Sequence, residues 1–401
     1  MKRSALTSLA LSLMSMTAAP ASAADDTLKI YLMIGQSNME GQAYAYHIPQ
    51  TGPGTWNVPT IQDMVDRPAT LNALPDDVFT FADHFSPDWL NNRNDVWAVH
   101  HRSDNGANLP VKNGTSEPVG GWDTGVQPLQ PGFGLANSPF AGLFGAELAM
   151  GQRLGDAMNS PVLLFKSSKG GTDLAYNWRP PSAVADRGGS IGAHYTNTVA
   201  QFQAQLDTLD ADLGDDGLLN NYNNATGYEV AGIVWLQGWN TTSGSQANYT
   251  TAQKIAEYAD NFEDLIEDIR ASDSRIANNA PVIIVESSDQ SATLNTERQA
   301  AVDLLNADNP GSAVFIETNG LKGVNYSALG VTNVNGDPYN NGWGFHFHAR
   351  AENFLEIGWK IGDAVIENGY TGSEVVPEPS SLMLLGAGGL ILLRRRNTRK
   401  D

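Results

Sequence analysis

A serine lies in a turn-forming run directly after the first apolar segment of the chain. Residues Leu28–Ile34 are few and rich in β-branched and aromatic side chains, which predicts a buried strand that ends at Gly35. Ser37 then falls on the strand-to-helix turn, in the sequence GQSNMEG of Gly35–Gly41. Such a turn raises a side chain above the carboxyl end of a parallel sheet, where open α/β folds bind ligands. Ser37 is therefore a candidate nucleophile, and a serine that only caps a helix is the alternative.

The run Gly35–Gly41 resembles the first conserved block of the SGNH hydrolases, in the branch of sialate O-acetylesterases and plant and bacterial carbohydrate acetylesterases. In that branch GQSNMxG carries the nucleophile, and seven consecutive residues of this chain match. The resemblance extends loosely over residues 28–368. It implies that Ser37 is the nucleophile of an ester hydrolase, and we assign its neighbours Gln36 and Asn38 to substrate binding.

The second and third blocks of the family follow the next two predicted strands. Gly170 and Gly171 come after the strand Val162–Lys166, where relatives carry a glycine whose backbone N–H stabilises the oxyanion. The third block, GxN, reads Gly238-Trp239-Asn240 after the strand Ala231–Leu236. The resemblance therefore assigns Gly170, Gly171 and Asn240 to the oxyanion hole. Beside them, Gln237 and Trp239 are expected to bind substrate.

The base of such an enzyme is a histidine, and the chain has seven of them. Two of these, His346 and His348, lie directly before a predicted C-terminal helix. Relatives have an Ile-Gly pair at a fixed distance after the base, and Ile357-Gly358 matches this distance when His346 is the base. His348 fits a shorter-gap variant of the family. The alternation of a strand would point both imidazoles to one side, so that His348 supports the base or binds substrate.

The carboxylate of the family's DxxH motif is missing from its place. Trp343 stands three residues before His346, and Phe345 stands three residues before His348. Either another carboxylate, such as Asp337, orients the imidazole, or a backbone carbonyl does so and the site is a Ser-His dyad.

Metal binding is the alternative use of the two histidines. Two imidazoles on one strand face can bind zinc, but the spacing assigns no third ligand and leaves the serine block unexplained. We expect neither a metal nor a cofactor.

The composition limits the classes of partner and chemistry. The chain has 401 residues, no cysteine and a formal net charge of −20. The lack of cysteine excludes disulfides, thiolate metal sites and cysteine nucleophiles. A strongly acidic surface repels nucleic acid and anionic lipid. We therefore expect no nucleic-acid partner.

The elements that must position these residues alternate between strands and helices. Two further strands are predicted at Pro281–Glu286 and Ala313–Glu317. A proline in the first turn predicts that a helix begins at Ser138-Pro139, and another helix is expected at Ala351–Asn368. This alternation predicts a three-layer α/β/α sandwich with a mainly parallel, five-stranded sheet. The resemblance implies the flavodoxin-like SGNH form of that architecture.

A long segment after the first strand interrupts the pattern. Residues 43–135 are rich in Gly, Pro, Asn and Asp, and we interpret them as an insertion that covers the substrate and contains a short hairpin. Its tryptophans Trp89, Trp97 and Trp122 either stack on sugar rings or form the local core of the insertion.

Both ends of the chain resemble targeting segments. Residues 1–24 have a basic start, an apolar stretch and the small-x-small pattern Ala21-Ser22-Ala23, which predicts a cleaved signal peptide. Residues 373–401 contain a proline motif, the apolar run Leu382–Leu393 and three arginines, an order that resembles a PEP-CTERM sorting signal. This resemblance implies an exosortase-type partner, a Gram-negative host and transient anchoring of a transmembrane helix in the inner membrane. A plain membrane anchor is the alternative.

These observations predict one catalytic domain over residues 25–372. We expect an exported or surface-displayed serine esterase that removes O-acetyl groups from a carbohydrate. Two alternatives are an esterase acting on lipid or peptidoglycan, and a catalytically inactive glycan-binding module, which the missing DxxH aspartate motivates. The oligomeric state does not follow from the sequence.

Overall fold

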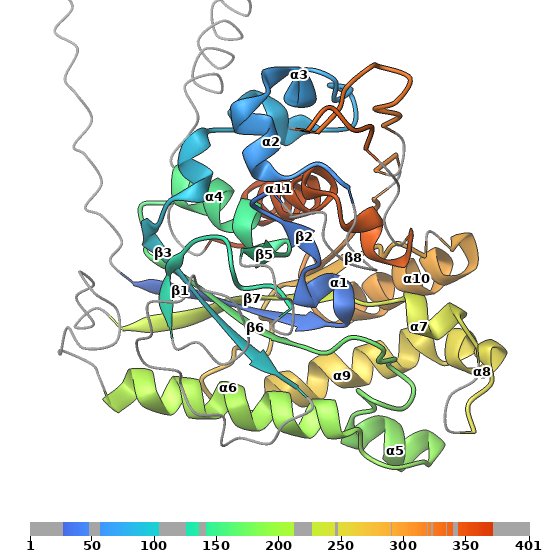
Figure 1. The fold of residues 1–401 in the computed structure, drawn as a ribbon. Helices are drawn as coiled ribbons and strands as arrows, with labels where there is room; N and C mark the ends of the chain where they lie inside the picture. The colour runs from blue at the N-terminus through green and yellow to red at the C-terminus, as the bar shows by residue number, and fades with distance from the viewer. Residues whose placement is uncertain are drawn as a thin grey trace, which may run out of the picture.

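A seven-stranded sheet forms the centre of the protein (Figure 1). The structure is a computed structural model that describes residues 27–47, 57–103, 126–135, 142–211, 227–244, 248–289, 291–318, 320–321, 324–333, 335–339 and 344–371. The strands are Leu28–Gly35 (β1), Arg93–Arg102 (β3), Gln127–Leu129 (β4), Val162–Ser168 (β6), Tyr228–Leu236 (β7), Val282–Val285 (β8) and Ala313–Ile316 (β9). Their order across the sheet is β4-β3-β6-β1-β7-β8-β9, and every neighbouring pair is parallel except β3 and β4.

The predicted fold class is confirmed, but the predicted number of strands is wrong. The five expected strands are β1, β6, β7, β8 and β9, and their order β6-β1-β7-β8-β9 is the flavodoxin-like one. Two more strands, β3 and β4, come from the segment interpreted as an insertion. Only the middle of β3, from Val96 to His100, is buried. Its apolar run is therefore short, and the strand depends on pairing with β6, which lies 60 residues further along the chain.

Alternation along β1 separates two hydrophobic cores. Tyr31 and Met33 belong to one buried cluster, and Ile30, Leu32 and Ile34 belong to the other. Figure 1 shows α4 (Glu147–Ala157) and α11 (Ala351–Glu367) over one face of the sheet, and α6 (Ala193–Ala211) and α9 (Tyr258–Ser272) over the opposite face. The sheet is therefore covered on both faces, as a mainly parallel sheet requires.

Helix positions follow the apolar periodicity with two local differences. A single amphipathic helix around residues 255–269 is divided into α8 (Thr251–Ala256) and α9. The helix expected from Ser138 begins only at Glu147. Leu143–Phe144 forms β5, which pairs with β2 (Ala43–Tyr44), and residues 136–141 lie outside the described ranges. The remaining longer helices are α5 (Pro181–Arg187) and α10 (Ala292–Asp308).

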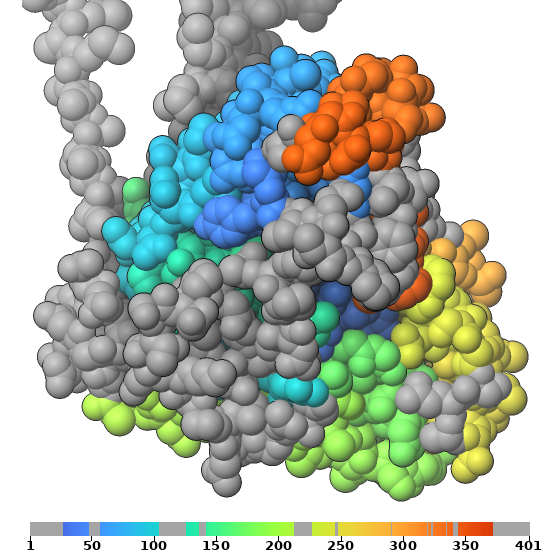
Figure 2. Space-filling model, viewed as in Figure 1, coloured from blue at the N-terminus to red at the C-terminus, as the bar shows by residue number. Residues whose placement is uncertain are grey.

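The helical part of the insertion packs against α11, where the Phe81 N–H donates to Glu356 Oε2 at 3.2 Å (Figure 1). It contains α2 (Ile61–Asp66), α3 (Pro68–Leu71) and the 3₁₀ turns η1 (Thr80–His84) and η2 (Pro87–Leu90). In Figure 2 the blue residues of this part lie beside the orange residues 324–333 and 335–339, where Arg67 donates to Thr332 Oγ1 at 3.1 Å.

Two of the three tryptophans of the insertion belong to the protein core. Trp89 is 3% exposed and its ring stacks on Trp359, and Trp97 is 2% exposed in the core under α6. Neither side chain is available to stack on a sugar. Trp122 lies outside the described ranges.

None of the described helices combines the length and the hydropathy that crossing a bilayer requires. The predicted signal peptide and the apolar run Leu382–Leu393 both lie outside the described ranges.

Candidate active site

A pocket of about 450 Å³ lies where the loops after β1, β6 and β7 meet. Figure 1 shows α1 (Ser37–Glu40) and α7 (Trp239–Thr242), which follow β1 and β7, at the same end of the sheet. The pocket is lined by Ser37, Glu40, Gln42, Leu135, Lys169, Gly170, Gly171, Trp239, Asn240, Ser243, Phe345 and His346. All five residues assigned to catalysis therefore lie around one cavity, although they come from four separate segments of the chain.

The turn that presents Ser37 depends on two glycines. At Gly35 a Cβ atom would lie 2.2 Å from the carbonyl oxygen of Leu236 on the neighbouring strand. Gly41 has φ +91°, and a Cβ atom there would lie 2.4 Å from the backbone nitrogen of Gly145. Between these glycines the chain makes the single helical turn α1, which leaves Ser37 8% exposed at the pocket.

Gly170 approaches the serine closely. A Cβ atom at Gly170 would lie 3.2 Å from Ser37 Cβ and 3.0 Å from Glu40 Oε2. Any larger residue would therefore crowd the serine. Gly171 is exposed with φ +77°, so the backbone turns there in a left-handed conformation.

The buried side-chain amides of Gln36 and Gln237 position the loop that carries Asn240. Gln237 donates from Nε2 to the carbonyl of Thr172 at 3.1 Å and to Thr241 Oγ1 at 3.2 Å. Gln36 Oε1 accepts from Gln237 Nε2 at 3.4 Å and from the Asn240 backbone N–H at 3.5 Å. These contacts connect the loops after β1, β6 and β7.

Gln36, Asn38 and Gln237, which the sequence assigns to substrate binding, lie buried beside the pocket. All three side chains are at most 1% exposed, and none lines the pocket. Asn38 Nδ2 donates to Ser287 Oγ at 2.9 Å and to Ser288 Oγ at 3.0 Å. These side chains support the loops instead, because buried amides make their hydrogen bonds to neighbouring protein groups. Trp239, by contrast, does line the pocket.

His346 and His348 differ in their surroundings because the backbone between them is a turn. Residues Gly344–Ala349 form a 3₁₀ turn with φ of +47° at Phe347 and +62° at His348. Strand alternation therefore does not apply, and only His346 of the two lines the pocket. Such positive φ values in residues other than glycine are costly and mark a segment that its surroundings hold in place.

Neighbouring elements hold this turn. Ser288 Oγ donates to the carbonyl of Phe345 at 2.5 Å, and Asn353 Nδ2 donates to the carbonyl of Phe347 at 2.7 Å. Since Ser288 also accepts from Asn38, the serine turn and the histidine turn share a hydrogen-bond network. Burial lowers the pKa of His346 to about 4, so its imidazole is neutral at pH 7.

Asp337, the carboxylate considered for orienting the base, belongs to another turn. It is exposed, its N–H donates to Asn333 Oδ1 at 2.9 Å, and its carbonyl accepts from Asn57 at 3.4 Å. It does not line the pocket.

Sequence reasoning did not single out Glu40, which also lines the pocket. Burial raises the pKa of its carboxyl above the ordinary value, although a hydrogen bond from the Gly170 backbone and the charge of Lys169 oppose that rise. Lys166 lies beneath it, donates to the Glu40 carbonyl at 3.0 Å and pairs with Glu147 at 2.8 Å. The spacing could have identified Glu40, because it follows Ser37 by one helical turn and therefore lies on the same face of α1.

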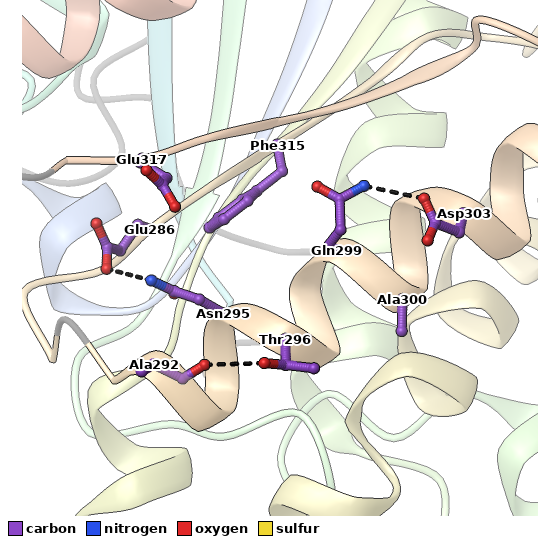
Figure 3. A pocket seen from close by; sticks show the side chains of 9 residues that line it. All are labelled: Glu286, Ala292, Asn295, Thr296, Gln299, Ala300, Asp303, Phe315 and Glu317. Atoms are coloured by element: carbon purple, nitrogen blue, oxygen red, sulfur yellow. Dashed lines mark hydrogen bonds between the residues drawn. The ribbon is translucent and has the colours of Figure 1, made fainter.

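A second, larger pocket does not contain the groups that ester hydrolysis needs. It has about 660 Å³ and lies between α10 and the ends of β8 and β9 (Figure 3). Its deepest carboxylate, Glu286, accepts from Asn295 Nδ2 at 2.6 Å and from the Thr318 N–H at 2.7 Å. Its lining includes neither a serine nor a histidine.

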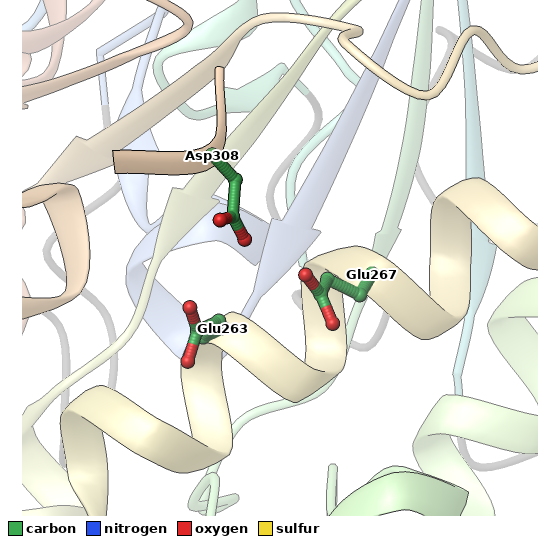
Figure 4. Close-up of side chains that lie close together, drawn as sticks. All are labelled: Glu263, Glu267 and Asp308. Carbon is green, nitrogen blue, oxygen red and sulfur yellow. The ribbon is translucent and has the colours of Figure 1, made fainter. Parts of the chain in front are cut away.

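Three carboxylates come together on the outer helices. Glu263 and Glu267 lie one turn apart on α9, and Asp308 ends α10, with their oxygens within 4.8 Å of one another (Figure 4). Burial and the neighbouring negative charges raise the pKa values of both glutamates. No histidine belongs to this group, and none of its members lines the pocket of Ser37.

Comparison with known families gives two matches along the chain. The family model described as carbohydrate esterase, sialic acid-specific acetylesterase matches residues 115–328. This span contains Gly170 and Asn240, whereas Ser37 and His346 lie on either side of it. The model of the PEP-CTERM protein-sorting motif matches residues 375–399. Among curated proteins, no match was found.

Several solved structures are similar to this chain at low identity. One is a protein of Arabidopsis thaliana, with 13% identity and a TM-score of 0.47 over 85% of this chain and 98% of that chain. Another is a carbohydrate acetylesterase from Xanthomonas citri, with 14% identity and a TM-score of 0.41 over 85% of this chain and 56% of that chain. A third is NanS, with 12% identity and a TM-score of 0.40 over 73% of this chain and 78% of that chain.

Proposed function

The chain belongs to the sialic acid-specific acetylesterase family of carbohydrate esterases, and we propose that it hydrolyses O-acetyl esters of a carbohydrate by a Ser-His mechanism at the pocket of Ser37. One observation carries this proposal: Ser37, Gly170, Gly171, Asn240 and His346 line the same cavity. A serine esterase needs a nucleophile, a base and donors for the oxyanion, and these five residues supply all three.

In the proposed reaction, Ser37 Oγ attacks the acetyl carbonyl while His346 accepts the hydroxyl proton. The negative charge that develops on the carbonyl oxygen is stabilised by the Asn240 amide and by the N–H groups of Ser37 and of Gly170 or Gly171. The C–O bond to the sugar then breaks, and His346 returns the proton to the departing sugar hydroxyl. Water, deprotonated by His346, hydrolyses the acetyl-serine and releases acetate. The proposed mechanism uses neither a metal nor a cofactor.

The pocket lining supports a carbohydrate rather than a long acyl chain. The rings of Trp239 and Phe345 lie 5.7 Å apart on one side of the pocket and offer apolar faces for a sugar. The remaining lining is mostly polar, with Glu40, Gln42 and Lys169 able to bond hydroxyl groups. A lipid esterase would need a continuous apolar groove.

Hydrolysis of p-nitrophenyl acetate tests the proposal. Ser37→Ala should lower the rate to the uncatalysed background, and the exposed Ser327→Ala should leave it unchanged. Equal rates in the wild type and in Ser37→Ala would sink the esterase mechanism and favour a glycan-binding module. If the wild type is active and Ser37→Ala is not, acetate release from a panel of acetylated polysaccharides would identify the polymer. Retained binding of the same polymers by Ser37→Ala would show that its pocket is intact.

We also propose export, with residues 1–24 as a cleaved signal peptide and residues 25–372 as one catalytic domain. The PEP-CTERM match supports processing of residues 373–401 by an exosortase-type enzyme at the surface of a Gram-negative cell, after transient anchoring in the inner membrane. N-terminal sequencing of the exported protein should find a start near Ala24. Deletion of residues 373–401 should prevent its retention at the cell surface.

A further inference from the structure

A buried lysine lies between the two loops that carry the proposed oxyanion donors. Lys254 of α8 donates from Nζ to the backbone carbonyl of Asn240 and pairs with the carboxylate of Asp173 at 3.2 Å. Asp173 belongs to the loop after β6, three residues beyond Gly170, and Asn240 belongs to the loop after β7. The side chains of Lys254 and Asp173 are 1% and 0% exposed. One ammonium group therefore contacts both loops.

Each partner of this contact is fixed by further bonds. Asp173 Oδ1 accepts from the Tyr176 N–H at 2.9 Å, and the Asp173 N–H donates to Asn177 Oδ1 at 3.0 Å. Lys254 lies on α8, whose start is fixed by a capping box between Thr250 and Gln253. The lysine thus extends from a separately anchored helix to both loops.

Burial of this pair is not explained by stability alone. Taking two charges out of water is costly, and well-packed apolar residues often do as well or better. A buried ion pair instead restricts its neighbours to one arrangement, because each charge requires its partner in place. Here the restricted groups are the backbone of Asn240 and the loop that begins at Gly170.

We propose that Lys254 is a positioning residue that, together with Asp173, sets the distance between the Asn240 amide and the Gly170-Gly171 turn. This inference rests on the proposed esterase function, in which the Asn240 amide and a backbone N–H of that turn bind the oxyanion. Lys254 does not line the pocket. A second connection between the same loops, from Gln237 Nε2 to the Thr172 carbonyl, remains when Lys254 is removed. Its loss should therefore loosen the oxyanion hole without dismantling it.

The first test is Lys254→Met in the full chain, assayed with p-nitrophenyl acetate. We expect kcat to fall on the order of 10- to 100-fold while KM changes less than about twofold, because a displaced oxyanion donor weakens the transition state more than substrate binding. The matched control is Lys29→Met. Lys29 is also 1% exposed and paired with a glutamate, Glu229, but it lies at the opposite end of β1. Its replacement should leave kcat within about twofold of the wild type.

The double variant Lys254→Met/Asp173→Asn separates positioning from folding. Lys254→Met alone leaves the Asp173 carboxylate buried without its partner, which could destabilise the protein. The second substitution removes that charge and should restore the thermal midpoint. If Lys254 positions Asn240, kcat stays low in the double variant despite its restored stability. Recovery of kcat together with stability would overturn the inference, as would a folded Lys254→Met with wild-type kcat.

Failure of the two proposals can be distinguished. If the wild type and Ser37→Ala hydrolyse the ester equally, the esterase function itself fails. If the wild type is active and Ser37→Ala is not, the result with Lys254 tests only the positioning role.

Discussion

The two ends of the parallel sheet bury charged side chains in different ways. At the carboxyl end, near the pocket, the pairs Lys166–Glu147, Lys254–Asp173 and Arg298–Asp289 have both partners at most 2% exposed. At the amino end, the buried Lys29 on β1 pairs with Glu229, whose side chain is 44% exposed. The first arrangement removes both charges from water, whereas the second leaves the carboxylate solvated.

The difference is matched by what the cations contact. Lys166 donates to the carbonyl of Glu40 and Arg298 to the carbonyl of Gln237 at 3.0 Å each, and Lys254 donates to the carbonyl of Asn240. Each of these three cations thus holds the backbone of a loop that carries pocket residues. The buried charges at the carboxyl end therefore fix the positions of the pocket loops, although burying them costs stability.

Removal of one lysine at each end should give the largest contrast. Lys166→Met leaves Glu147 buried without its partner and should lower the free energy of unfolding by about 3–5 kcal/mol. Lys29→Met leaves a solvated carboxylate and should cost no more than about 1 kcal/mol. Urea unfolding of both variants measures this. Equal losses would contradict the comparison.

Glu352 extends the comparison to the segment behind the histidine turn. Burial raises the pKa of its carboxyl from 4.5 to about 7. The unfolded chain releases this proton near pH 4.5 and the folded chain near pH 7, so stability falls as the pH rises through that window. Glu352→Gln should therefore stabilise the protein at pH 8, by on the order of 2 kcal/mol, and lose this advantage below about pH 5. Unfolding of Glu352→Gln and of the exposed Glu367→Gln at both pH values provides the check.

The pH dependence of activity tests burial at the pocket itself. Since burial lowers the pKa of His346 to about 4, the neutral imidazole persists in acid. We expect kcat/KM to stay level down to about pH 5 and to fall about tenfold per pH unit below 4. A histidine with its ordinary pKa would lose activity below about pH 6.5. Recovery of full activity after return to pH 7 serves as the control for unfolding, and an acid limb near 6.5 would refute the expectation.

The smallest change in stability is expected at the solvent-facing cluster of carboxylates on α9 and α10. Glu263 and Glu267 lie one turn apart beside Asp308, and their raised pKa values mean that folding disfavours the charged forms. Glu267→Gln should therefore stabilise the protein at pH 7, by no more than about 0.5 kcal/mol. The gain should shrink in 0.5 M NaCl, because salt screens exposed charges. A loss of stability comparable to that of Lys166→Met would remove the distinction between buried and exposed clusters.

Local patterns predicted the parts of the fold that depend on neighbours in sequence. The strand Leu28–Gly35 and its serine turn follow from an apolar run that ends in glycine. β3 was missed because only the five residues Val96–His100 of it are buried and its pairing with β6 is distant in sequence. The predicted helix start at Ser138 is wrong because Leu143–Phe144 forms a strand that pairs with Ala43–Tyr44. The apolar periodicity of the segment itself cannot reveal a partner that lies about 100 residues earlier in the chain.

In the candidate site, too, local motifs predicted some features, and contacts between distant segments decided the others. Short motifs identified Ser37, Gly170, Gly171, Asn240 and His346, and these residues do surround one pocket. Motifs did not separate substrate contacts from supporting contacts, so Gln36, Asn38 and Gln237 were assigned to the pocket although they are buried beside it. They also did not separate His346 from His348, because the turn between them is held by Ser288 and Asn353 from other elements.

The sequence by itself determined the family, the positions of five strands along the chain and the residue types available for ester hydrolysis, because these depend on local patterns of apolar residues, glycines and polar blocks. Tertiary structure alone decided which side chains meet. The contact of Lys254 with Asp173 and Asn240, and the buried surroundings that lower the pKa of His346, arise only when distant segments pack together. Hydrogen bonds and desolvation act over a few ångströms in space, whatever the separation in sequence.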